Sequence, residues 1–165
     1  MREAYRQFAQ QYGVPWKHRD YKTTAWDEAD PINRALSVAN HVLYSICQGA
    51  IVSLGYSAGL GFIHTGKMLS FVYDIADLYK AECSIPAAFS VVGKGYADLD
   101  GEVRSACRRL LKAQKIMKRI PEDIAWILDV RNVQEQEEEL PIGALWDEDD
   151  KRISGGINHA PEAPK

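Results

Sequence analysis

Two aspartates and a histidine have the residue types and the spacing that divalent-metal chemistry requires. Asp74 and Asp77 stand three positions apart, so a helix spanning them would place both carboxylates on one face. An isolated pair of this kind is more often part of a solvated acidic surface, but the residues around this one are largely apolar. His64, ten positions before Asp74 in a glycine-rich stretch, would add one nitrogen to the two oxygen donors. Such a set suits Mg²⁺ or Mn²⁺ better than structural zinc, and it leaves coordination positions open for a phosphate.

A row of cations is the second chemical signal. Five basic residues step by four, four, three and four positions and would share one face of a helix: Arg104, Arg108, Lys112, Lys115 and Arg119. No acidic residue between 103 and 119 offsets them, so the row fits the charge of a nucleic-acid backbone, although a merely solvated helix face would look the same. Basic and aromatic residues from Trp16 to Trp26 could stack on unpaired bases, but burial is the commoner fate of such rings.

Helices must position these residues. Apolar residues that recur every three or four positions predict helices over about 3–12, 31–54, 70–81 and 99–120, with a short helix after Pro86 and a last one after Pro121 to about 130. Residues 55–67 form a glycine-punctuated loop. No stretch alternates over six or more residues, so the predicted fold class is all-α, a helical bundle over residues 1–140. Residues 141–165, rich in proline, glycine and acidic side chains, are predicted to be a disordered acidic tail.

Composition narrows the class of protein further. The 165 residues, 46% hydrophobic and 26% charged, suit one globular domain. The charged N-terminus is unlike a signal peptide, and the longest apolar stretch, about 50–63, is shorter than the ~20 residues of a membrane span. Three cysteines without a C-x-x-C spacing disfavour a disulfide framework and a zinc site. We therefore expect a soluble cytoplasmic protein with no membrane partner, in which Cys47 and Cys107 are buried thiols.

One stretch of the sequence is recognisable. Gly61-Phe62-Ile63-His64-Thr65-Gly66-Lys67, followed by Leu69 to Leu78, closely resembles the CRISPR-associated integrase of spacer acquisition, in its type I-E branch. The likeness covers about residues 2–120 and includes Glu102 to Arg108. It implies the α-helical C-terminal domain of that family. Members cut DNA and join a captured fragment into the CRISPR array, through attack of a DNA 3′-hydroxyl on a phosphodiester.

The resemblance also implies roles for single residues. His64 and Asp77 match metal ligands and Asp74 the acidic residue of the same catalytic site, with Mg²⁺ or Mn²⁺ as the cofactor. The positions expected to contact DNA are those that match the family together with the basic helix: Lys67, Tyr73, Tyr21, Trp26, Tyr44, Arg104, Arg108 and Lys112. The implied partners are double-stranded DNA with single-stranded ends, the small second adaptation protein of CRISPR systems, and a second copy of the chain.

One departure from the family bears on activity. The family supplies a glutamate ligand from a helix upstream of the segment that matches Arg2 to Tyr5, and a β-rich domain before it, whereas Glu3 is out of register for that role. We therefore expect a site that is one ligand short and a chain with little or no activity alone. A non-catalytic DNA- or partner-binding module is the alternative, and it would keep its DNA affinity in EDTA. A third hypothesis, a metal-dependent phosphohydrolase that acts on small nucleotides, is less favoured because it would give the basic helix no role.

Overall fold

The longest helix, α2 (Pro31–Ser53), forms the centre of the helical part of the chain. The residues whose spacing predicts it are the ones it buries: Ile32, Leu36, Ala39 and Leu43 are at most 1% exposed. Proline occupies the first position, where its missing N–H removes no helical hydrogen bond. Helices α3, α4, α5 and α6 all pack against α2. Burying this apolar stripe is therefore what assembles the unit.

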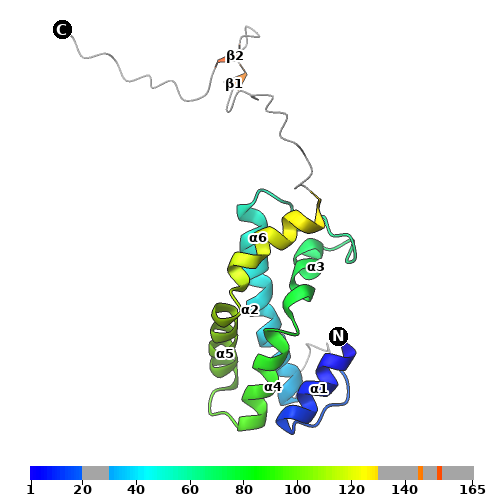
Figure 1. Ribbon diagram of the computed structural model, residues 1–165, viewed down its shortest axis with the longest axis vertical. Helices are drawn as coiled ribbons and strands as arrows, with labels where there is room; N and C mark the ends of the chain where they lie inside the picture. The colour runs from blue at the N-terminus through cyan, green and yellow to red at the C-terminus, as the bar shows by residue number, and fades with distance from the viewer. Residues whose placement is uncertain (20–29, 130–144, 147–151, 154–165) are drawn as a thin grey trace, which may run out of the picture. The chain divides into compact units, whose positions relative to one another are not determined.

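The computed structural model describes residues 1–19, 30–129, 145–146 and 152–153. Its contacts divide the chain into two units, Met1–Leu128 and Asp129–Lys165. Within the described part of the first unit every element is a helix (Figure 1). The helices other than α2 are α1 (Arg2–Tyr12), α3 (Ser70–Tyr79), α4 (Ser84–Lys94), α5 (Leu99–Ala113) and α6 (Ile116–Ile127). The all-α prediction is confirmed.

The second unit is described at only two short segments. Strand β1 (Leu145–Trp146) pairs antiparallel with β2 (Arg152–Ile153). Sequence periodicity did not predict this pairing, because two residues are too few to show an alternation. The prediction of a disordered tail otherwise concerns residues outside the described ones.

One predicted helix is wrong, and the correction divides the row of cations. The predicted helix over 99–120 is two helices, because Lys115 adopts a left-handed conformation with φ 52° between α5 and α6. Helix α6 then continues through Pro121, which removes only one hydrogen bond. Three isoleucines at spacings of four hold α6 in the core: Ile116, Ile120 and Ile124. Ala113 and Met117, whose spacing within 99–120 would place them on the apolar face of one continuous helix, are exposed.

Two smaller findings concern the first residue of α4 and the length and hydropathy of α2. The short helix predicted after Pro86 begins at Ser84, with Pro86 in its first turn, where proline is tolerated. Helix α2 is long and apolar enough by composition to cross a membrane, although half of the relevant window is buried by other helices. That burial is typical of a core helix, which passes the same test of length and hydropathy.

Cys47 and Cys107 are buried, as their places on apolar helical stripes predict, and Cys83 is buried as well. Cys47, Cys83 and Cys107 are free thiols without exposed surface. Burial, with a smaller effect of Cys83, raises the pKa of the Cys47 thiol to about 12. A thiol with so high a pKa is a poor nucleophile at neutral pH, so Cys47 acts as a small apolar core residue.

A buried tyrosine joins α3 to α6. The Tyr79 hydroxyl donates to Asp123 Oδ2 at 2.5 Å, and the guanidinium of Arg119 lies 5.3 Å from the Tyr79 ring centre. Arg119 in turn donates two hydrogen bonds to Glu82, at 2.6 and 3.3 Å. Burial first, and the contact with Asp123 second, raise the pKa of Tyr79 above its ordinary value. The folded chain therefore holds the neutral phenol.

The Tyr79 contact predicts a loss of stability in alkali. Because the folded-state pKa of Tyr79 is raised, its contribution is fully present below pH 10 and is lost as the pH rises above 10, where the unfolded chain ionises. The difference in unfolding free energy between the wild type and Tyr79→Phe should fall by about 1.4 kcal/mol per pH unit above pH 10. Urea denaturation between pH 8 and 11 measures it, and a difference that stays constant would contradict the assignment.

Candidate metal centre

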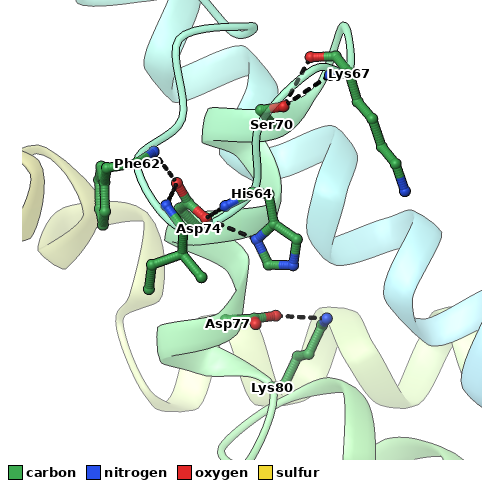
Figure 2. Close-up of polar contacts among 8 residues, drawn as sticks. Phe62, His64, Lys67, Ser70, Asp74, Asp77 and Lys80 are labelled. Carbon is green, nitrogen blue, oxygen red and sulfur yellow. Dashed lines mark hydrogen bonds and ion pairs between the residues drawn. The ribbon is translucent and has the colours of Figure 1, made fainter.

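The buried carboxylate of Asp74 organises the loop between α2 and α3. Its Oδ2 accepts hydrogen bonds from the backbone N–H groups of Phe62 and Ile63, at 2.7 and 3.1 Å. Its Oδ1 accepts from the backbone N–H of His64 at 2.9 Å and lies 2.7 Å from His64 Nδ1 (Figure 2). The side chain of Asp74 has no exposed surface. One anion on α3 therefore holds three consecutive loop residues.

The charge on Asp74 follows from these contacts. Burial by itself would raise the pKa of Asp74, but the hydrogen bonds from His64, Phe62 and Ile63 outweigh it and hold the pKa below 3.8. Because the carboxylate is ionised at neutral pH, it accepts a hydrogen bond from the N–H of His64 Nδ1. The Nε2 atom of His64 is then the nitrogen available to a ligand, as in metal sites where a carboxylate orients the coordinating histidine.

The close approach of this loop to α3 depends on Gly61. A Cβ at position 61 would lie 2.8 Å from Asp74 Oδ2 and 2.7 Å from the backbone carbon of Ser70, and it would also overlap the carbonyl oxygen of His64. The Ser70 hydroxyl then joins the loop to the start of α3, accepting from Lys67 N at 3.1 Å and donating to Lys67 O at 2.9 Å. The glycine-punctuated sequence of the loop was evident, but the roles of Gly61 and Ser70 were not predicted, because both depend on contacts that only the folded loop makes.

Asp77 lies one turn further along α3 and has a different partner. Its Oδ1 forms an ion pair with Lys80 Nζ at 2.6 Å (Figure 2). The ammonium lies 5.2 Å from the centre of the Tyr44 ring. Burial would lower the pKa of Lys80, but hydrogen bonds with Asp77 and Tyr44 raise it above its ordinary value. Lys80 is a residue that the sequence analysis missed, although its position three residues after Asp77 could have indicated the pair.

Aromatic rings complete the surroundings of His64. The His64 ring packs edge-on against Tyr73 with ring centres 5.7 Å apart, and Tyr73 packs edge-on against Tyr44 at 5.0 Å. His64, Tyr73, Tyr44, Lys80 and Asp77 thus form a continuous chain of contacts. Among the residues that the structure describes, however, no three histidine, cysteine, aspartate or glutamate side chains gather closely enough to form a metal site. The structure brings His64 to Asp74 and pairs Asp77 with Lys80 instead.

The remaining predicted residues divide into three groups. Lys67 is exposed on the loop, whereas Tyr21 and Trp26 lie outside the described residues. Three cations of the predicted row are exposed on α5: Arg104, Arg108 and Lys112. Lys115 and Arg119 no longer share that helix, and Arg119 pairs with Glu82. Helices α5 and α3 lie on opposite sides of α2 in Figure 1.

Comparisons with known proteins identify the family. Residues 3–121 match the model of the family "CRISPR associated protein Cas1". The chain is 43% identical to the CRISPR-associated endonuclease Cas1 2 of Thermus thermophilus, over 99% of this chain and 52% of that protein. It is 47% identical to the Cas1 endonuclease of Geobacter sulfurreducens, over 78% of this chain and 42% of that protein. The chain belongs to the Cas1 family.

Solved structures agree with this assignment. The crystal structure of a TtCas1-DNA complex matches with a TM-score of 0.71 and 49% identity, over 74% of this chain and 46% of that one. The crystal structure of TtCas1 matches with a TM-score of 0.65 and 48% identity. The family predicted from the motif around His64 is confirmed. The chain spans about half the length of the curated relatives it matches.

Proposed function

We propose that this chain is the helical, metal-binding part of a CRISPR adaptation enzyme. This enzyme would cut DNA and join DNA 3′-hydroxyls to phosphodiesters of the CRISPR array. The relatives are named as CRISPR-associated endonucleases, and one solved relative is a complex with DNA. The observation that carries the proposal is the loop geometry: a buried, ionised Asp74 orients His64 so that Nε2 is free to bind.

The donors present fit a divalent cation that prefers oxygen and nitrogen. We propose that His64 Nε2 and Asp77 are its direct ligands, with Mg²⁺ or Mn²⁺ as the cofactor. Asp74 remains a predicted member of the catalytic site, and its hydrogen bonds favour a positioning role over direct ligation. When bound, the cation would supply Lewis-acid stabilisation of the charge that develops on the phosphoryl oxygens. Asp74 keeps the His64 ring oriented, and Tyr73 limits its rotation by edge contact.

The exposed basic side chains are suited to contact the negatively charged DNA backbone. Among the described residues, the side chains of Arg104, Arg108 and Lys112 on α5 form no ion pair with an acidic residue. The side chain of Lys67 on the loop forms none either. We propose that α5 holds the DNA backbone at a distance from the reacting phosphodiester, while Lys67, Tyr73 and Tyr44 lie near the reacting end. The proposed roles of Tyr21 and Trp26 in DNA contact stay predictions.

The wider biological setting is proposed from the family. We propose a catalytic-type helical domain over residues 1–140 followed by the acidic tail 141–165. The proposed partners are DNA duplexes with single-stranded ends, the small second adaptation protein and a second copy of the chain, in the cytoplasm. With only His64 and Asp77 as direct ligands, the chain on its own is expected to turn over DNA poorly.

A metal-dependence assay tests the proposed function. Branched and half-site DNA are incubated with the chain and Mn²⁺, beside His64→Ala and Asp77→Asn variants. Weak cleavage or joining that both substitutions abolish is the expected result. Turnover that survives both substitutions would contradict the proposed centre. A chain that binds DNA equally well in EDTA and performs no chemistry would instead be the binding module, which the separation of α5 from the loop also fits.

Salt dependence measures the role of α5. If three cations contact phosphates, the logarithm of the DNA association constant should fall with the logarithm of salt concentration at a slope of roughly −3. The Arg108→Gln substitution should make that slope shallower by about 1, because one phosphate contact is lost. Lys118→Gln on α6 removes the same charge from an exposed position elsewhere and is the matched control. An equal effect of both substitutions would show that net charge, not the α5 face, governs binding.

A further inference from the structure

The ion pair at Asp77 is more enclosed than a surface pair on a helix. The Lys80 side chain is only 14% exposed, and the Asp77 Oδ1 that it contacts at 2.6 Å has no access to solvent. The face of the Tyr44 ring, 5.2 Å from the ammonium, provides a second favourable contact for the same charge. Figure 2 shows the ammonium beside the Asp77 carboxylate, one turn of α3 beyond Asp74.

We propose that Lys80 is a built-in substitute for the divalent cation at Asp77, which neutralises the carboxylate in the metal-free chain and must be displaced when a metal binds. The inference rests on the proposed function, in which Asp77 is a metal ligand. A divalent cation and an ammonium on the same carboxylate repel each other strongly at such short range. The unbranched lysine side chain can swing away without movement of the main chain.

A simpler role of Lys80 at the end of α3 does not explain these contacts. Lys80 is the C-terminal cap residue of α3, where a cation is favoured by the helix dipole. A cation in that role needs neither a 2.6 Å contact with Asp77 nor an aromatic ring beneath it. The Asp77 side chain is 36% exposed, but its Oδ1 is buried, and a buried carboxylate oxygen without a compensating charge is costly, so a cation is favoured beside it when no metal is bound. Lys80 is the cation in contact with Asp77 in the described part of the chain.

Metal affinity in the absence of DNA tests the proposal. Mn²⁺ binding to the chain is measured by electron paramagnetic resonance for the wild type, Lys80→Met and Lys80→Arg. Methionine keeps the apolar stem and removes the competing charge, so it should tighten Mn²⁺ binding by about tenfold or more. Arginine keeps the charge and should leave the affinity near that of the wild type. Lys118→Met, which removes a charge from an exposed position on α6, should change it less than about twofold.

Two outcomes separate this inference from the proposed metal centre. If Asp77→Asn leaves Mn²⁺ affinity unchanged, the proposed centre itself is wrong. If Asp77→Asn abolishes binding but Lys80→Met weakens it or leaves it unchanged, Lys80 is a structural partner of Asp77. The proposal that Lys80 stands in for the metal is then overturned, while the proposed metal centre is retained.

A spectroscopic readout on the unmodified chain keeps the test independent of variant folding. The ¹⁵N resonance of the Lys80 ammonium is followed while Mg²⁺ is added, with Lys80→Arg supplying the assignment. Displacement predicts a shift and faster exchange of the ammonium protons as Asp77 takes up the metal. An ammonium signal that does not move at Mg²⁺ concentrations that shift the His64 ring resonances would overturn the proposal.

Discussion

Replacing Asp74 with alanine should destabilise the helical unit by about 3–5 kcal/mol. The substitution leaves the backbone N–H groups of Phe62, Ile63 and His64 without their acceptor. It also frees the His64 ring, whose Nδ1 loses the 2.7 Å contact that orients it. Stability and metal affinity should therefore fall together.

Urea denaturation measures the loss, and Asp77→Ala on the same helix is the matched control. In the described part of the chain Asp77 accepts no hydrogen bond from the loop backbone, and its side chain, 36% exposed, pairs with Lys80, so its removal should cost less than that of Asp74. Asp74→Asn keeps the shape but replaces one acceptor oxygen with a donor, and it should give an intermediate loss. An Asp74→Ala chain as stable as Asp77→Ala would show that Asp74 does not hold the loop.

The Gly61→Ala substitution is expected to disrupt the same loop by steric overlap. The added methyl would meet the Asp74 carboxylate, the start of α3 and the His64 carbonyl at less than contact distance, and two of these neighbours are backbone. Overpacking of this kind costs about 1–3 kcal/mol or more, because the backbone must move to relieve it. His64 would move with the loop, so Mn²⁺ affinity should be lost even in the fraction that stays folded.

Gly49 supplies the control for this substitution. It is exposed on α2, and a Cβ there would meet no atom within 4 Å. Gly49→Ala should therefore stabilise the chain by about 1 kcal/mol, since alanine is the better helix former. Thermal melts and histidine ring spectra of both variants make the comparison. If Gly61→Ala melts as Gly49→Ala does and keeps the His64 ring signal, the close packing of the loop is not required.

The helices were predictable where burial follows a local period. The apolar stripe of α2 and the segments around α1 and α3 repeat every three or four residues, so their ranges match the structure within about two residues. The break at Lys115 was not predictable in this way, because a left-handed lysine has no sequence signal comparable to glycine. The chain turns there because Ile116 and its neighbours find buried positions, which is a tertiary effect.

From the sequence alone, apolar spacing predicted the helical class, the resemblance around His64 indicated the Cas1 family, and His64, Asp74 and Asp77 were predicted as its site. The tertiary structure decided which contacts each of these three side chains makes. Asp74 turns inward, where backbone N–H groups surround it, whereas Asp77 meets the ammonium of Lys80. Spacing places two carboxylates on one helix face, but the direction of hydrogen bonds and the depth of burial depend on the neighbours that the fold supplies. The N–H groups come from the loop before α3, which no local pattern around the aspartates could reveal, whereas Lys80 follows Asp77 by three positions at the end of the same helix.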